Sequence, residues 1–429
     1  MTRVLPRNFA PFLATALVVW PVMAYTGAQG FTGSVGIAGL IALLYLRIDG
    51  VKPYIIAGLG FLLWTVAAST WGPSGGALFE GSLLKGDFSV EAIGVRFGLT
   101  LLAAMAMIMA VKAVGEAQAA RSLVAIEGAA WVNGVAALIT AIFLAPLMAW
   151  ILDQGLSTDY GSLTQNLLRN ANCFALLLPI LLARLWYRDG GLGGRAVAGL
   201  VVVLSVLTFA LTGTQTALMG LAFAGLAMAI VHVLSRSGFR VLFWGLSAVT
   251  LLGPVLYGAV GAVLLRSGLP LPGSFFSRIK GWQLVNEKIT EAPLFGHGVE
   301  ATYQWGTLFA ERPEWLAEAL DRYGLNQGWQ KYEILNSHPH SMPLQVWVDT
   351  GFIGAGFLSL TLFLFGLRLK RPDQWPPMAK YAAAGLIGVA SAVYGFSLSL
   401  WNEAFWCSVA LAAAAVLLMA RQAGQEQTK

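Results

Sequence analysis

Long apolar blocks, separated by short polar breaks, fill most of the 429-residue chain. Each block approaches the roughly 20 residues that a helix needs to cross the hydrocarbon layer of a bilayer. The blocks predict twelve transmembrane helices, near residues 9–28, 31–47, 53–71, 97–115, 129–152, 170–187, 196–212, 215–234, 239–265, 342–367, 379–399 and 402–420. The first block follows a short basic stretch, as in a signal peptide, but the next begins almost at once, so we expect it to be retained. The pattern predicts an all-α polytopic membrane protein.

Composition supports a lipid environment. Hydrophobic residues make up 57% of the chain and charged residues only 11%, whereas soluble domains carry about 25% charged residues. The only cysteines, Cys173 and Cys407, fall in apolar runs. They suggest neither a disulfide framework nor a thiolate metal cluster, and we expect them to be packing residues.

The positive net charge of +6 is mainly a signal of membrane topology. Of the 27 Lys and Arg residues, seventeen fall on the N-terminal side of the predicted membrane and seven lie in segment 266–341. The short loops of the opposite side hold only Lys85, Arg96 and Arg169. Because short cytoplasmic loops are enriched in Lys and Arg, both termini are predicted to be cytoplasmic and segment 266–341 periplasmic, in a bacterial inner membrane. Nucleic acid is not an expected partner.

Segment 266–341 divides the chain between the ninth and tenth predicted spans. We expect nine spans in residues 1–265, a helical periplasmic segment with the active site in 266–341, and three spans with a short tail in 342–429. The segment has seven Lys or Arg, eight Asp or Glu, and three of the four histidines. Within it, residues 311–323 have helical apolar spacing and predict an amphipathic helix on the membrane or over a cavity.

Three motifs lie close together here: Arg278 one helical turn before Trp282, the turn 293–298 (PLFGHG), and His340-Ser341 followed after nine residues by Gly351-x-x-Gly354. In these motifs the chain resembles the O-antigen ligase family, membrane glycosyltransferases related to O-antigen polymerases and protein O-oligosaccharyltransferases. The detailed resemblance covers roughly residues 266–367.

The resemblance implies a GT-C-like helical fold and an inverting glycosyltransferase without cofactor or metal. Its donor would be O-antigen on undecaprenyl diphosphate, its acceptor lipid A-core, and its surroundings membrane lipids. One departure is Gln215, in the turn Thr212–Thr216, where many relatives have arginine. We expect Arg169 to compensate for that missing charge.

The chemistry of such a transfer matches residue types in the segment. Guanidinium groups bind phosphate oxygens in bidentate fashion, and a histidine near its usual pKa of about 6.5 accepts a proton at neutral pH. We therefore predict a catalytic group and a substrate-binding group. The catalytic residues are His340, Arg278 and Arg266, and the substrate-binding residues are His338, Arg169, Gln215, Lys280 and Trp282.

Other interpretations stay open. His338 and His340 could ligate a metal, although three or four ligands are needed. Lys280 and Trp282 could be membrane anchors, and Asp349, inside a predicted span, could be functional or a buried polar contact. Among functions, a polymerase or protein-glycosylating enzyme of the same superfamily is the nearer alternative. A flippase or transporter of lipid-linked sugars is the more distant one.

Overall fold

The structure is a computed structural model that describes residues 28–43, 51–73, 79–81, 90–111, 114–155, 160–188, 191–335 and 337–426. Side chains 28–31, 160–170 and 422–426 are outside this description. Most described residues are helical, and the bridge residues among them, such as the pair Leu308 and Glu333, are isolated and form no strand. The all-α prediction is confirmed.

Seven described helices are long and apolar enough to cross a membrane. They are α4 (Ile93–Val111), α5 (Glu116–Ile142), α8 (Leu192–Leu211), α9 (Gln215–Val233), α14 (Met342–Arg368), α15 (Pro377–Phe396) and α16 (Glu403–Glu426). The remaining larger apolar helices are α2 (Ala28–Leu43), α3 (Pro53–Ser69), α6 (Leu144–Asp153) and α7 (Tyr160–Arg188). These helices indicate a multi-pass membrane protein. The count of about twelve spans stays a prediction, and residues 9–27 of the first one lie outside the described residues.

The predicted span 239–265 is wrong as a single straight helix. The structure has α10 (Gly238–Leu251) and α11 (Gly253–Arg266), bent by 84° at the break between them. Pro254 explains the break, because proline lacks an amide hydrogen and fits the first turn of a new helix. Counted as one broken span, the pair would be an eighth crossing.

The span predicted at 129–152 also differs, because α5 begins at Glu116 and a separate helix, α6, follows it. The first half of α5, outside the predicted span, holds the charged residues Glu116, Arg121 and Glu127. Glu127 pairs with Arg184 of α7 at 2.9 Å, and the Arg184 side chain is almost completely buried. An ion pair of this kind lets charged residues remain inside a helical bundle.

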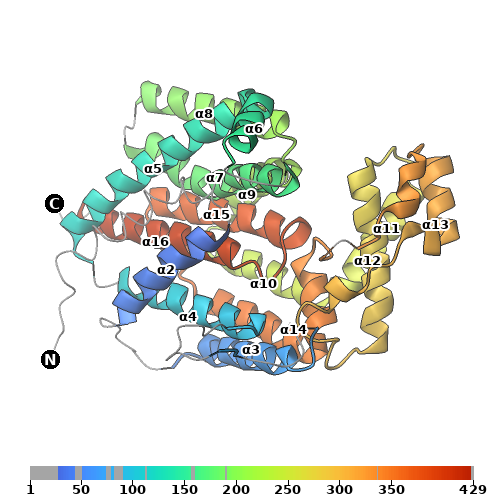
Figure 1. Cartoon of the computed structure of the whole chain (residues 1–429). Helices are drawn as coiled ribbons and strands as arrows, with labels where there is room; N and C mark the ends of the chain where they lie inside the picture. Colours follow the sequence, from blue (N-terminus) through green and yellow to red (C-terminus); the bar gives the residue numbers. More distant parts are fainter. Residues whose placement is uncertain are drawn as a thin grey trace.

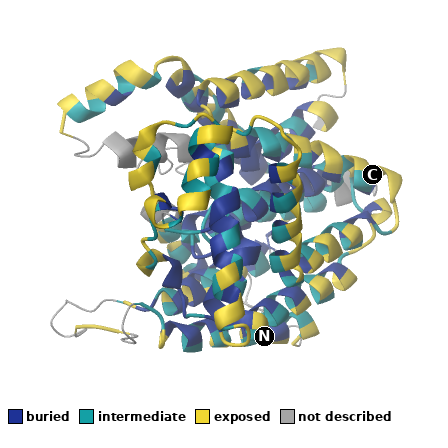
Figure 2. Ribbon diagram, turned by 90° about the vertical axis from the view of Figure 1, so that its right-hand side faces the viewer, coloured by how far each residue is buried: buried dark blue, intermediate teal, exposed yellow. Residues whose placement is uncertain are grey.

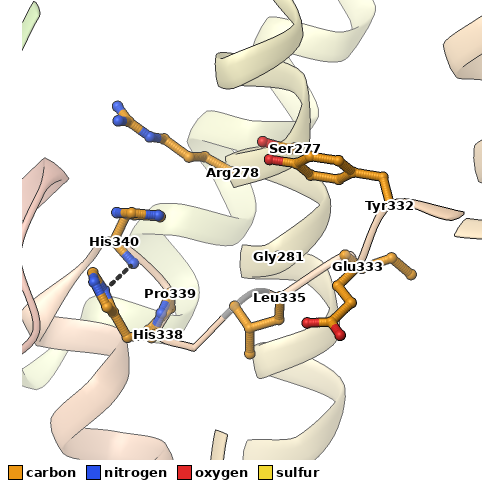
Figure 3. Close-up of a pocket in the computed structure, with 10 residues that line it drawn as sticks. Ser277, Arg278, Gly281, Tyr332, Glu333, Leu335, His338, Pro339 and His340 are labelled. Carbon is orange, nitrogen blue, oxygen red and sulfur yellow. Dashed lines mark hydrogen bonds between the residues drawn. The ribbon is translucent and has the colours of Figure 1, made fainter. Parts of the chain in front are cut away.

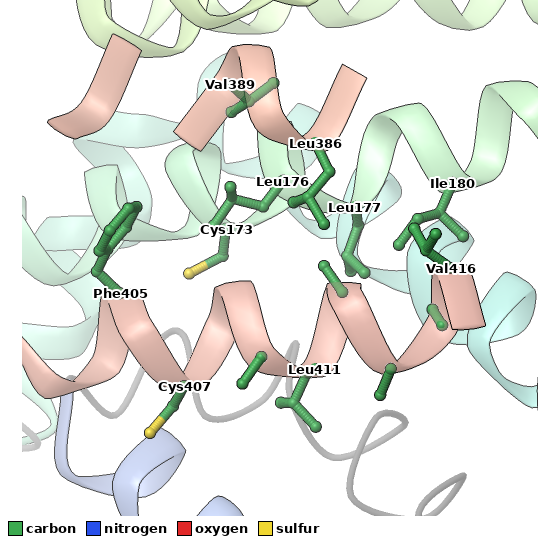
Figure 4. Close-up of a cluster of buried hydrophobic side chains, with 14 of the residues drawn as sticks. Cys173, Leu176, Leu177, Ile180, Leu386, Val389, Phe405, Cys407, Leu411 and Val416 are labelled. Atoms are coloured by element: carbon green, nitrogen blue, oxygen red, sulfur yellow. The ribbon is translucent and has the colours of Figure 1, made fainter. Parts of the chain in front are cut away.

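The main core lies where α7, α15 and α16 meet. Figure 4 shows Leu177 and Ile180 of α7 facing Leu411 of α16, with Leu386 of α15 beside them. Buried residues run through the centre of the bundle and exposed ones cover its outer faces (Figure 2). Both cysteines are buried among the apolar side chains of this core, as the packing interpretation predicted.

A helical subdomain projects from one end of this bundle. It consists of α11, α12 (Gly273–Glu291), α13 (Pro313–Ala317) and the π turn Glu318–Arg322 (Figure 1). Its own core includes Phe276 of α12 and Ala319 of the π turn. A helical segment is therefore present within 311–323, and its apolar residues Trp315, Leu316 and Ala319 pack on the subdomain core.

The turn 293–298 fits into a kink of α14 at Gly351, whose φ of 66° and ψ of −169° interrupt the helix. The amides of Phe352 and Ile353 bond to the carbonyls of Pro293 and Leu294. The amides of His297 and Gly298 bond in turn to the carbonyls of Val348 and Asp349. The turn thus replaces two helical hydrogen bonds with four, so the kink leaves no amide or carbonyl at these positions unsatisfied.

The two glycine-containing motifs are therefore parts of one joint. A Cβ on Gly296, whose φ is +70°, would lie 2.6 Å from backbone atoms of Asp349 and Gly351. The two glycines of α14 lie against different neighbours. Gly354 lies against Trp64 of α3, and Gly351 lies against the turn. The joint fixes the position of the first half of α14. It thereby also fixes the position of His340 and Ser341, which directly precede this helix.

Candidate functional site

A pocket lies between the first half of α12 and the chain segment that leads into α14 (Figure 3). It occupies about 310 Å³, including space open to solvent. Its lining residues are Ser277, Arg278, Gly281, Tyr332, Glu333, Ile334, Leu335, His338, Pro339 and His340. Three of the eight predicted site residues, Arg278, His338 and His340, therefore meet in one place.

His340 is held in a fixed orientation at the start of α14. Its backbone is in the left-handed region, with φ of 51°, and Ser341 caps the helix by accepting the amide of Leu344 at 3.4 Å. The His340 Nδ1 lies 2.8 Å from the carbonyl oxygen of Ser397, just after α15. A carbonyl can only accept, so Nδ1 carries the hydrogen and Nε2 of the neutral ring has a free lone pair.

His338 supports the backbone of His340. Its Nδ1 accepts the amide hydrogen of His340 at 3.2 Å, and the two ring centres are 4.4 Å apart. Burial, the neighbouring His340 and the positive charge of Arg278 lower the pKa of His338 to about 3. His338 is therefore neutral at physiological pH, with its Nδ1 lone pair already occupied.

Arg278 supplies the permanent positive charge of the pocket. Its guanidinium lies 5.7 Å from the ring centre of Phe275, and Figure 3 shows it extending past His340. Burial lowers the pKa of Arg278, but an arginine stays charged at neutral pH. Burial and the nearby Arg278 also lower the pKa of His340, while the Ser397 carbonyl opposes this change.

Trp282 and Lys280 do not line the pocket. The indole of Trp282 is buried and donates a 3.0 Å hydrogen bond to the carbonyl of Pro339, which anchors the turn between the two histidines. Lys280 is buried against Trp315 and pairs with Glu318 at 2.7 Å. Both side chains hold the subdomain together.

Three other predicted site residues, the catalytic candidate Arg266 and the substrate-binding candidates Gln215 and Arg169, are not among the residues that line this pocket. Arg266 ends α11 and is exposed. Gln215 is the exposed first residue of α9. Because α9 runs antiparallel to α15, Gln215 lies at the same end of the bundle as Ser397. Arg169 falls within α7, but its side chain is outside the described residues.

Asp349 is a buried contact between helices. Its carboxylate accepts a 2.6 Å hydrogen bond from the indole of Trp401, and Gln345 one turn earlier accepts the amide of Leu400 at 2.8 Å. These bonds fasten the turn between α15 and α16 that also presents the Ser397 carbonyl. In the described part of the chain, no group of three or more His, Cys, Asp or Glu is arranged to hold a metal ion.

Sequence reasoning missed Ser397, Tyr332, Ser277 and Glu333. Ser397 acts through its backbone, which no residue type reveals, and it is 57 residues from His340. Tyr332 and Glu333 lie in a polar segment without a regular period. Ser277 does have a sequence signal, because it directly precedes Arg278 on α12.

Comparison with known proteins addresses the same region. Residues 200–359 match the family model described as O-antigen ligase, a range that includes α12, the turn 293–298 and both histidines of the pocket. No curated protein matches the chain, and no solved structure does. This match supports membership of the chain in the O-antigen ligase superfamily of glycosyltransferases.

Proposed function

We propose that this protein is an inverting O-antigen ligase of the bacterial inner membrane. It transfers O-antigen from undecaprenyl diphosphate to lipid A-core at the periplasmic face, with both termini in the cytoplasm. The family match supports a lipid-linked sugar donor and a lipid acceptor in general. The observation that carries the proposal is the oriented His340 imidazole, whose free Nε2 shares a pocket with Arg278.

In the proposed reaction, Nε2 of His340 takes the proton from an acceptor hydroxyl. The hydroxyl oxygen attacks the anomeric carbon from the face opposite the diphosphate, and the bond between this carbon and the diphosphate oxygen breaks. Undecaprenyl diphosphate leaves with the bonding electrons. Arg278 stabilises the growing negative charge, since a guanidinium donates two parallel hydrogen bonds to phosphate oxygens.

The remaining predicted residues act around this centre. We propose that Gln215 donates a neutral hydrogen bond to the donor from the bundle end that carries Ser397, and that Arg266 and Arg169 attract the anionic donor. His338, Lys280 and Trp282 act by positioning, because their described contacts are with protein atoms.

Purified protein in lipid nanodiscs separates the candidate functions. It is given lipid-linked O-antigen alone, with lipid A-core, or with a peptide acceptor, each in buffer with and without EDTA. A ligase yields product only with lipid A-core, and EDTA has no effect. Longer lipid-linked chains from donor alone would indicate a polymerase, and a glycosylated peptide a protein-glycosylating enzyme. If no bond forms but donor crosses a vesicle membrane, the protein is a transporter.

Replacing His338 is expected to affect the rate through the position of His340. In His338→Ala the His340 amide loses its acceptor, and kcat should fall about 10- to 100-fold, the loss that an ångström-scale misplacement causes. KM should change little. In His338→Asn the Oδ1 can accept the amide two residues ahead, as in an Asx turn. That variant should keep at least about a third of the wild-type kcat by the same geometric argument.

Steady-state rates at several pH values check this prediction. The pH at which the rate is half-maximal should be similar in wild type and His338→Asn, because His338 itself does not titrate in the working range. Equal losses in the Ala and Asn variants would mean that the imidazole itself is required, which contradicts the positioning role.

A further inference from the structure

An aromatic stack supports the side of the pocket that lies away from the histidines. Tyr332 stacks on Trp329 with ring centres 4.9 Å apart, and Trp329 contacts Phe309 at 5.1 Å. Phe309 in turn stacks on Phe276 of α12 at 5.9 Å, and both phenylalanines are completely buried. The stack holds the Tyr332 ring in place although 47% of this residue is exposed.

Polar groups line the pocket near this ring. Ser277 and Glu333 line the same pocket as Tyr332, and in Figure 3 the Tyr332 side chain extends toward Ser277. The Ser277 hydroxyl donates to the carbonyl of Ser274 at 3.2 Å, so its lone pairs remain able to accept. Glu333 adds a carboxylate, and no described Lys or Arg lies within ion-pair distance of it.

The two halves of the pocket differ in charge and suit different parts of one substrate. Arg278 and the histidines form a half that suits an anion. The half around Tyr332 repels an anion, because Glu333 is negative. It combines a flat apolar face with three hydroxyl or carboxylate groups, and Gly281, packed close to Ile334 and Leu335, lies between the halves. A sugar ring has matching features, with an apolar C–H face and hydroxyl donors along its edge.

We propose that Tyr332, Ser277 and Glu333 form a subsite for one sugar ring next to the reacting groups. The sugar stacks on Tyr332 and donates hydroxyl hydrogens to Glu333 and Ser277. This inference rests on the proposed function, and it adds the location at which the glycan binds. The ring belongs either to the acceptor core or to the first sugars of the donor, and both sources offer the same chemistry. The rigid support of Tyr332 favours binding, because little side-chain freedom is lost.

Kinetics with purified protein in nanodiscs test the subsite, with donor and acceptor concentrations varied separately. Tyr332→Ala should raise the KM of one substrate roughly 5- to 50-fold, the range typical of an aromatic residue central to a binding site. Tyr332→Phe and Tyr332→Trp should stay within about 3-fold of wild type, because they keep the ring. The substrate whose KM rises is the source of the sugar. Lys331→Ala is the matched control, since Lys331 is an exposed neighbour that does not line the pocket.

A binding measurement keeps this test independent of catalysis. Saturation-transfer NMR detects the lipid-free core oligosaccharide and the lipid-free donor glycan bound to wild type, His340→Ala and Tyr332→Ala. The subsite predicts binding of one of them to wild type and to His340→Ala, and weakened binding to Tyr332→Ala. If the wild type binds sugar but transfers none, the proposed function fails while the subsite stands. Unchanged KM values and binding in Tyr332→Ala, with active wild type, would overturn the subsite.

Discussion

His340→Ala should lower kcat for glycan transfer by about 10²- to 10⁴-fold, the usual contribution of a general base. The reason is the single free lone pair at Nε2, which the Ser397 carbonyl fixes by accepting from Nδ1. The neighbouring imidazole cannot substitute, because the Nδ1 of His338 is already an acceptor for a backbone amide. Single-turnover rates with saturating donor and acceptor measure the loss.

The matched control is His232→Ala. His232 lies near the opposite end of α9 from Gln215 and bonds to the hydroxyl of Tyr381, away from the pocket. This variant should transfer glycan at the wild-type rate. Both variants should unfold within a few degrees of the wild-type temperature, since each loses one side-chain hydrogen bond, worth about 1 kcal/mol. Transfer by His340→Ala at a rate within a few-fold of wild type would refute the assignment of the base.

Gly351→Ala should destabilise the fold by about 3 kcal/mol or more, because a left-handed backbone strains a residue with Cβ and overpacking adds to that cost. The added methyl would lie 2.6 Å from the amide nitrogen of Phe295 and would push the turn 293–298 out of the kink. Four backbone hydrogen bonds between the turn and α14 would then be disturbed. Thermal unfolding in detergent, followed by tryptophan fluorescence, measures the effect.

Gly356→Ala serves as the control on the same helix. A Cβ at Gly356 meets no atom within 4 Å, and its backbone is helical. Alanine also has a higher helix propensity than glycine, so this variant should be as stable as wild type or slightly more so. Equal unfolding temperatures for the two alanine variants would show that the joint between the turn and α14 contributes little to stability.

The sequence pattern predicts the helices well and their bends poorly. Apolar periodicity locates α8, α9, α14, α15 and α16 within a few residues, because long apolar runs have few alternative structures in a membrane. The 84° bend between α10 and α11 was missed, since the apolar run continues through Pro254 without a polar break. Only the packing of α11 against α12 shows that the chain has left the bundle.

Site residues that act through a specific side chain could be predicted from the sequence. Site residues that act through a backbone atom, or whose direction depends on packing, could not. The sequence identifies His340 and Arg278 by residue type and spacing, and the structure brings both into one pocket. Trp282 and Lys280 have equally suitable side chains, but burial turns them toward the protein interior. Ser397 contributes a carbonyl oxygen from a distant turn, and such a contact depends on tertiary packing alone.

The central claim is that the neutral His340 ring accepts the proton of the acceptor hydroxyl. The pH dependence of kcat/KM for the acceptor tests this claim most directly. A base acts only when it is deprotonated, so activity is present above its pKa and is lost as the pH falls through that pKa. Burial and the charge of Arg278 lower the pKa of His340 below 6.5. The acidic fall of the profile should therefore have its midpoint below the usual histidine value of about 6.5. A fall that is half complete above pH 7, or no acidic fall at any pH where the protein stays folded, would contradict the account.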